Sequence, residues 1–361
     1  MTRKIQESLL DTSLYTDNKI IAPMMLSKKF ITMKKFILSL VLLAVTTCYS
    51  QELNLPVFTQ YLADNPFILS PAYAGIGDNL RIRANGLTQW VGIKDAPDNQ
   101  SVYADFRVLD RSGVGISLYN DSNGNTRQTG AKVSFAHHLI LDYTSKQYLS
   151  FGISYNFNTF RILKENFTDN SNNPNDPPVT LNPALLGDRN NTNNNFDISA
   201  LYRNKSFYIS FNANNVLKKN VDKFKGVEPE LLSNYQVYTG YVFKDGENSR
   251  IEYEPSVFYQ YFASDQRSTT DFNFKYRRFN RYEDYYWIGV SYRFLNDQFP
   301  KPLSVGPMAG FMKSKFYFAY SYQVMFNDLG SYNTGTHSIT IGFDFLGSIS
   351  NCPCTQSPVH D

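Results

Sequence analysis

Apolar and polar residues alternate with a period of two in many short segments of this chain. The segment 151–158 reads FGISYNFN, with aromatic or aliphatic residues at every odd position and small or polar residues at every even one. Segments 101–108 (SVYADFRV), 271–277 (DFNFKYR) and 338–345 (SITIGFDF) repeat the pattern. A period of two places alternate side chains on opposite faces of a β-strand. The pattern therefore predicts strands with one apolar and one polar face.

The alternation predicts fourteen strands after the first 79 residues, at 80–90, 99–109, 113–120, 127–139, 147–160, 195–203, 206–213, 234–244, 249–262, 268–279, 283–293, 303–312, 314–325 and 335–346. An even number of antiparallel strands is typical of single-chain bacterial outer-membrane barrels. Alternation alone would also fit a soluble β-sandwich, so the choice of a barrel depends on further features of the chain.

The connections between these strands differ in length in a regular way. Tight connections at 110–112, 203–205, 244–248 and 313–314 alternate with long ones at 161–194 and 214–233. Outer-membrane barrels place short turns in the periplasm and long loops outside the cell. We therefore expect both ends of the barrel segment, 80–346, to lie on the periplasmic side, together with the tail 347–361.

An export signal precedes the predicted strands. Met33, Lys34 and Lys35 are followed by an apolar run over 36–45 and a short polar end at 46–50, which is the pattern of a secretory signal peptide. The apolar run is too short to cross a bilayer as a helix. We expect 33–50 to be the signal peptide, 1–32 to be an over-long start, and Gln51 to be the mature N-terminus.

Aromatic content and charge narrow the class further. The chain has 28 Phe and 26 Tyr but only 2 Trp, a content that suits strands and the aromatic girdles of membrane barrels. The formal net charge of +3 is close to neutral, and the basic residues form no stripe, so nucleic acid is not an expected partner. Charges such as Asp105, Lys275 and Asp344 recur within strands, and we expect them to face a solvated lumen.

Catalytic and metal-binding patterns are missing from the sequence. Among the four His residues, none forms HExxH or a close cluster with Cys or Asp, and no nucleophile elbow or phosphate loop occurs. His137 or His138 with Ser134 could form a lipase-type pair on the outer wall, although a structural role is favoured. We expect no enzyme, no cofactor and no metal. Cys352 and Cys354 are too close for an unstrained bridge, which favours an incidental pair in a flexible tail.

Two blocks of sequence resemble one known family. The first block reads QYLADNPFILSPAYAG over 60–75 and is followed by a Gln-Trp pair; the second reads YNTGTHS over 332–338. Both are similar to motifs of the PorP/SprF family of Bacteroidetes outer-membrane proteins. The matching residues, which are the candidate docking positions, are Gln60, Tyr61, Asn65, Pro66, Pro71, Ala72, Tyr73, Ala74, Gly75, Gln89, Trp90, Gly335 and His337.

The sequence also departs from the family pattern at three positions. Ser70 stands where Asn is usual, Leu87 where Arg often occurs, and Ser338 where an acidic residue often follows the His. Physically, Pro66 and Pro71 rule out a central strand. We therefore expect 51–79 to be an irregular segment tucked against or inside the barrel on its periplasmic side, either as a stabilising plug or as a docking surface.

The resemblance implies an accessory of the type IX secretion system in the outer membrane. Such a protein would bind the C-terminal sorting domain of a large secreted adhesin and support its export, surface anchoring and role in gliding. Other expected partners are periplasmic components of the translocon or motor, membrane lipid and lipopolysaccharide. The main alternative is a passive porin or solute channel on the same fold, and the sequence leaves open whether the pore is open or plugged.

Overall fold

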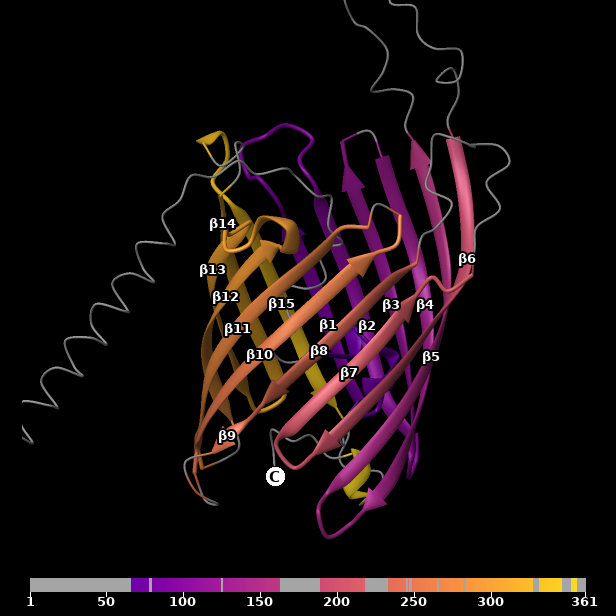
Figure 1. Ribbon diagram of the computed structural model, residues 1–361, viewed down its shortest axis with the longest axis vertical. Helices are drawn as coiled ribbons and strands as arrows, with labels where there is room; N and C mark the ends of the chain where they lie inside the picture. Colours follow the sequence, from indigo (N-terminus) through magenta and orange to yellow (C-terminus); the bar gives the residue numbers. More distant parts are fainter. Residues whose placement is uncertain are drawn as a thin grey trace, which may run out of the picture. The chain divides into compact units, whose positions relative to one another are not determined.

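Fourteen long strands form one closed antiparallel sheet in the computed structural model (Figure 1). All described residues belong to a single unit that spans residues 49–361. The structure describes residues 66–77, 80–124, 126–162, 189–217, 233–244, 246, 249–264, 266–281, 284–326, 331–345 and 352–355. The predicted start, the signal peptide and the candidate residues Gln60, Tyr61 and Asn65 lie outside these residues.

The sheet is made of long strands joined in sequence order. Their bounds are β1 Leu80–Thr88, β2 Asp98–Leu109, β3 Ser112–Asn123, β4 Thr126–Asp142, β5 Gln147–Ile162, β6 Arg189–Asn204, β7 Phe207–Asn214, β8 Asn234–Tyr241, β9 Phe243–Lys244, β10 Ile251–Phe262, β11 Ser268–Phe279, β12 Tyr285–Leu295, β13 Ser304–Lys313, β14 Phe316–Met325 and β15 Thr336–Phe345. The two-residue β9 continues β8 beyond Val242. Each of the fourteen predicted strands is therefore confirmed.

The barrel closes because the first strand pairs with the last. Leu80 lies opposite Phe345 and Thr88 opposite His337, and β1 also pairs with β2 along its other edge. A closed sheet has no free edge, which is what a strand structure needs within lipid. The expected all-β transmembrane barrel is confirmed, and among the described residues no helix is long and apolar enough to cross a membrane.

The predicted strand boundaries were least accurate beside the longest connection. We expected a loop from Arg161 to Asn194, but β5 continues to Ile162 and β6 begins at Arg189. Residue pairs from Arg189↔Ile162 to Asn194↔Phe157 extend the ladder through this Asn-rich stretch. Asn is depleted in strands, but the backbone ladder to β5 overrides that weak preference.

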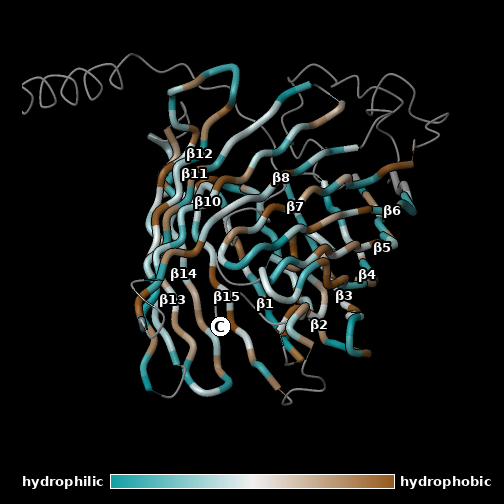
Figure 2. Tube along the Cα trace, turned by 60° about the horizontal axis from the view of Figure 1, so that its bottom comes forward, coloured by the Kyte–Doolittle hydropathy of each residue, from teal (hydrophilic) through white to brown (hydrophobic). Residues whose placement is uncertain are grey.

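The two faces of the sheet follow the predicted alternation. In β5, Phe151, Ile153 and Phe157 are exposed on the outer face, while Ser154 and Asn156 are buried on the inner face. Figure 2 shows the same alternation as repeated changes between hydrophobic and hydrophilic colours along the strands. An apolar exterior around a polar interior is the reverse of a soluble protein and is typical of an outer-membrane barrel.

We predict that a charge on the outer face is far more costly than one on the inner face of the same strand. Ile116 on β3 is 46% exposed on the outer face, and its neighbour Ser117 lines an inner cavity. Ile116→Arg should lower the free energy of unfolding by about 2–4 kcal/mol at the midplane, because the cation must enter lipid. Ser117→Arg should cost much less. Urea titrations of folding into phospholipid bilayers would measure both, and equal losses would contradict the face assignment.

The barrel has a short-turn end and a long-connection end. Turns such as 110–111, 205–206 and 314–315 lie at one end with the residues that precede β1 and follow β15. The described residues 89–97, 215–217 and 331–335, which belong to longer connections, lie at the other end. This arrangement matches the predicted alternation of lengths. The assignment of the short-turn end to the periplasm stays a prediction.

Candidate functional site

A plug segment, residues 66–77, lies inside the barrel. It forms two single turns of 3-10 helix, η2 Pro66–Ile68 and η3 Pro71–Tyr73. Pro71 suits the first position of η3, since it has no N–H to leave unpaired there. Burial raises the pKa of Tyr73 well above its usual value. The largest buried apolar cluster of the described residues is centred on this segment and contains Phe67, Leu69, Ala72, Tyr73, Ala74 and Ile76.

Glycines on the inner wall make room for the plug. A Cβ built at Gly113 on β3 would lie 2.2 Å from the carbonyl oxygen of Ala74, and one at Gly152 on β5 would lie 2.3 Å from the nitrogen of Ala72. On the plug itself, Gly75 has φ +75°, a region that side chains rarely adopt. The small residues of the PAYAG motif and the wall glycines therefore form one tightly packed interface.

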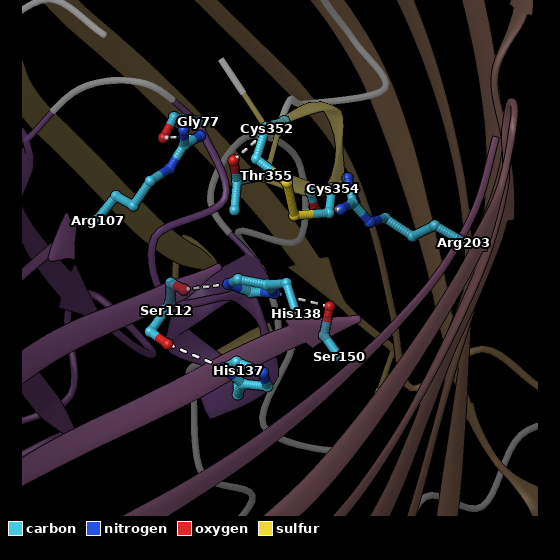
Figure 3. The surroundings of a disulfide bond; sticks show 11 residues. Gly77, Arg107, Ser112, His137, His138, Ser150, Arg203, Cys352, Cys354 and Thr355 are labelled. Carbon is cyan, nitrogen blue, oxygen red and sulfur yellow. Dashed lines mark hydrogen bonds between the residues drawn. A yellow bond between two sulfur atoms is a disulfide. The ribbon is translucent and has the colours of Figure 1, made fainter. Parts of the chain in front are cut away.

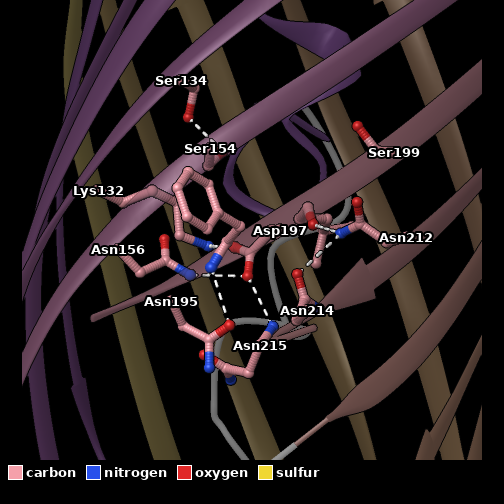
Figure 4. Close-up of polar contacts among 12 residues, drawn as sticks. Lys132, Ser134, Ser154, Asn156, Asn195, Asp197, Ser199, Asn212, Asn214 and Asn215 are labelled. Atoms are coloured by element: carbon pink, nitrogen blue, oxygen red, sulfur yellow. Dashed lines mark hydrogen bonds and ion pairs between the residues drawn. The ribbon is translucent and has the colours of Figure 1, made fainter. Parts of the chain in front are cut away.

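Hydrogen bonds from several strands hold the backbone of the plug. The N–H of Ala72 donates to Ser199 Oγ (2.9 Å), and the N–H of Gly75 donates to Asp105 Oδ2 (3.0 Å). Asn212 donates to the carbonyl oxygen of Leu69. Figure 4 shows Ser199 and Asn212 on this inner wall. Because the wall satisfies its backbone groups, the irregular segment can stay buried.

His138 belongs to the same set of anchors. Its Nε2 lies 3.0 Å from the carbonyl oxygen of Ala74, and its Nδ1 lies 2.8 Å from Ser150 Oγ (Figure 3). A carbonyl can only accept, so Nε2 carries a proton and donates to it. Ser150 can then donate to Nδ1, and both ring nitrogens of a neutral imidazole are used.

The residues considered for a lipase-type pair have other partners. Ser134 Oγ is bonded to Ser154 Oγ at 2.8 Å, and His137 Nδ1 lies 2.9 Å from Ser112 Oγ. Ser134 lies on the inner wall and His137 on the outer one, so the two face opposite sides of the sheet. Among the described residues, no group of three His, Cys, Asp or Glu side chains could hold a metal ion.

The C-terminal turn η8, Pro353–Thr355, docks beneath the plug and corrects one prediction. A disulfide joins Cys352 and Cys354, and Cys354 and Thr355 are fully buried (Figure 3). Gly77 donates its N–H to the carbonyl of Thr355, and Arg203 donates to that of Cys354. The prediction of an incidental pair in a flexible tail was wrong. The tight turn brings the two Cα atoms to 5.3 Å, an ordinary separation for a bridge.

Two other motif fragments, far apart in sequence, meet at the seam where the barrel closes. Val91, next to the Gln89–Trp90 pair, donates its N–H to the carbonyl oxygen of Gly335 at 3.1 Å and accepts from the N–H of Thr334. Gly335 has φ +96°, which favours glycine. These fragments lie at the long-connection end of β1 and β15, whereas the PAYAG motif lies in the lumen. The family motif therefore forms two separate structural groups.

His337 lies on the outer face beside this seam. It is paired in the ladder with Thr88 of β1, and its Nδ1 accepts from or donates to the Tyr320 hydroxyl at 2.7 Å. Of the candidate residues that the structure describes, those of the plug are buried in the lumen except Pro66, which is half-buried. At the seam, Gly335 and His337 contact the first strand or its extension, while Gln89 and Trp90 flank the contact made by Val91.

Many lumenal charges are buried and paired, and the expectation of a solvated lumen was wrong for them. Arg277 lies 2.6 Å from Glu252 and 3.3 Å from Glu254, and Lys275 lies 3.1 Å from Glu254. In each of the pairs Glu252↔Arg277, Glu254↔Lys275 and Asp271↔Arg293, the two residues lie directly opposite each other in the ladder. The sequence could have indicated these pairs, because the position of each turn sets which residues of the two hairpin strands lie opposite each other.

A vestibule occupies the lumen between the plug and the long-connection end. It is a cavity of about 270 Å³ whose floor includes Ile68 and Leu69 of the plug. About half of its lining residues are carboxamides, and the others include two tyrosines, Asp121 and the ion pair of Lys132 with Asp197 (Figure 4). The carboxamide residues are Gln89, Asn99, Gln128, Asn156, Asn158, Asn214, Asn215, Asn234, Gln236 and Gln260. Sequence reasoning missed this site because its residues come from strands across half the barrel.

The chain matches a protein-family model over most of its length. The model described as "Type IX secretion system membrane protein PorP/SprF" covers residues 50–343. A comparison with curated proteins finds no match.

A comparison with solved structures finds outer-membrane proteins of low sequence identity. The CymD monoaromatic hydrocarbon channel has a TM-score of 0.48 at 10% identity, covering 81% of this chain and 94% of that one. Omp33 of Acinetobacter baumannii has a TM-score of 0.40 at 10% identity, covering 74% of this chain and 100% of that one. An active-site mutant of the outer membrane phospholipase A of Escherichia coli has a TM-score of 0.33 at 10% identity, covering 80% of this chain and 95% of that one.

Proposed function

Because the chain belongs to the PorP/SprF family of type IX secretion system membrane proteins, we propose that it is an accessory that holds a secreted client at the cell surface. The barrel would receive the C-terminal sorting domain of a large adhesin and support its export and anchoring. Its place in the outer membrane follows from the fold and the family. The family match over residues 50–343 carries the proposal.

The plugged lumen supports a holding role more than passive conduction. A solute channel needs a continuous path lined by groups that admit the solute. Here the plug is bonded to β2, β4, β6 and β7, and the space above it ends on Ile68 and Leu69. A cavity that is closed at its base suits a protein that grips a partner at the mouth. A porin remains the second candidate, on the fold alone.

We further propose that the action is non-enzymatic. The side chains that sequence suggested for catalysis instead hold the plug or cross-link neighbouring strands, as His138 and Ser134 do. Periplasmic components of the translocon or motor would contact the short-turn end, and the outer face would contact lipid. Recognition would then depend on contact area and hydrogen bonds at the mouth.

We predict that the barrel, purified through an affinity tag in mild detergent, copurifies with one or a few large secreted adhesins. Mass spectrometry would identify them. Deleting the gene should remove those adhesins from the surface while other secreted proteins stay at normal levels. A tagged unrelated outer-membrane barrel from the same cells is the control for non-specific capture.

Other results of the deletion would contradict the proposal in distinct ways. Loss of uptake of a small solute, with all adhesins still displayed, would favour the porin. Loss of every secreted substrate would make the protein a core part of the translocon instead of a client-specific accessory.

A further inference from the structure

The vestibule has a chemical character that selects its ligand. Neutral carboxamides are the most numerous side chains of its wall. Of the charged ones, Lys132 is paired with Asp197, and Asp121 accepts a hydrogen bond from Asn99. The wall therefore offers a free ion few charged partners, and its polar surface suits no hydrocarbon. Each carboxamide presents a donor and an acceptor side by side. A ligand that matches this wall must itself carry closely spaced donors and acceptors without net charge. Peptide main chain and sugar hydroxyls both meet this condition.

One side of the wall is a preorganised ladder of amides. Asn234 Oδ1 accepts hydrogen bonds from Asn214 (2.9 Å), Gln236 (3.1 Å) and Gln260 (3.3 Å), which come from β7, β8 and β10. These bonds fix the amide planes in the absence of a ligand. A rigid set of polar groups loses little conformational entropy when it binds a partner.

The other side of the wall holds buried polar atoms with no hydrogen-bond partner. Asn156 is 7% exposed and donates through Nδ2 to Asp197, but its Oδ1 has no partner. Ser101 is 6% exposed, and its Oγ also has none. Asn158 Oδ1 is likewise buried without a hydrogen-bond partner. Buried polar atoms are normally satisfied, so a set of them around one cavity points to a polar ligand or to water that a ligand replaces.

The floor distinguishes a peptide from a sugar. Ile68 and Leu69 form an apolar base beneath the polar wall. An extended peptide can place an apolar side chain on such a base while its main-chain N–H and C=O groups meet the carboxamides. A sugar has no comparable apolar tip. A hydrophobic floor with a few oriented polar groups is also the usual composition of a specific ligand site.

We infer that the vestibule binds a short extended segment of a polypeptide, gripping its main chain by the carboxamide wall and one apolar side chain on Ile68 and Leu69. This inference rests on the proposed function, since the segment would belong to the secreted client. Recognition of the main chain makes few demands on sequence, and a single apolar residue sets the register. The vestibule would then be the site where the barrel binds the client that it holds at the cell surface.

Site-specific photocrosslinking in the full-length protein tests the inference in its own cells. A photoreactive residue is placed at Asn158 or Gln236 in the vestibule, and at Phe157 or Val237 as matched controls. Each control is the chain neighbour of a vestibule residue and faces the opposite side of the same strand. We expect crosslinks from Asn158 and Gln236 to map to one contiguous client segment that contains an apolar residue. Yields from the two control positions should be at least tenfold lower.

A substitution provides the second measurement. Asn158→Leu combined with Gln236→Leu should reduce the copurified client at least tenfold, while Phe157→Leu with Val237→Leu should not. The heat-modified gel migration of each variant reports whether the barrel has folded.

The outcomes separate this inference from the proposed function. A client that copurifies but is crosslinked only from positions outside the vestibule would overturn the inference and leave the proposed function standing. A barrel that captures no client and yields no peptide crosslink would overturn both. Crosslinks from Asn158 and Gln236 to lipopolysaccharide sugar would overturn the peptide assignment.

Discussion

Adding one methyl group at Gly113 should displace the plug and raise the conductance of the barrel. The new Cβ would lie 2.2 Å from the carbonyl oxygen of Ala74, a distance at which the backbone of one partner must shift. The wall strand is held by ladders on both sides, whereas the plug is held by single hydrogen bonds, so the plug should move. Gly152→Ala should act in the same way, because its Cβ would lie 2.3 Å from the nitrogen of Ala72.

Planar-bilayer recordings would measure the effect as single-channel conductance above that of the wild type. Gly86→Ala is the matched control, because a Cβ at Gly86 on β1 meets nothing within 4 Å. The barrel itself should still fold, since the strand ladders are unchanged, although the lost burial of the plug side chains will lower stability. Conductance equal to the wild type in both Gly113→Ala and Gly152→Ala would show that the plug tolerates the added groups and would contradict the tight interface.

The strands were predictable from sequence because lipid imposes a strict rule on them. Outward residues must be apolar, so the alternation in FGISYNFN or SITIGFDF indicates which face of the strand points outward, even when the neighbouring strands are unknown. The strand count and the alternation of short and long connections follow from the same rule. The errors fell where the rule does not apply, as in the Asn-rich start of β6, which extends beyond the predicted strand.

The interior was harder to predict because its contacts join residues that are distant in sequence. Pro66 and Pro71 indicated an irregular segment, but nothing local showed that Gly113 and Gly152 would make room for it. The same holds for the C-terminal turn, whose Cys354 carbonyl meets Arg203. Only the registers of the strands place these residues together. The lumenal ion pairs are an intermediate case, since the register of a single hairpin predicts them.

Removing the carboxylate of Glu254 should be among the most destabilising single changes in the lumen. Glu254 is 6% exposed and accepts from Lys275, Arg277 and the hydroxyl of Tyr208 (2.7 Å). Arg277 keeps Glu252 as a partner, but Lys275 would lose the ion pair with Glu254 while it stays 5% exposed. Breaking a buried ion pair on one side costs about 3–5 kcal/mol, and the contact of Lys275 Nζ with the Trp287 ring, 5.6 Å from the ring centroid, offsets only part of that cost. We expect a loss of this size in Glu254→Leu.

Two further variants separate the charge from the shape of the side chain. Glu254→Gln keeps an acceptor for Tyr208 and should lose less than Glu254→Leu. Combining Glu254→Leu with Lys275→Leu removes both charges and should recover part of the loss, since a buried pair replaced as a whole is often close to neutral. Urea unfolding from phospholipid vesicles would measure the free energies, with strand content followed by circular dichroism. Additive losses in the double variant would show that the lumen hydrates Lys275 and that the pair does not hold the wall together.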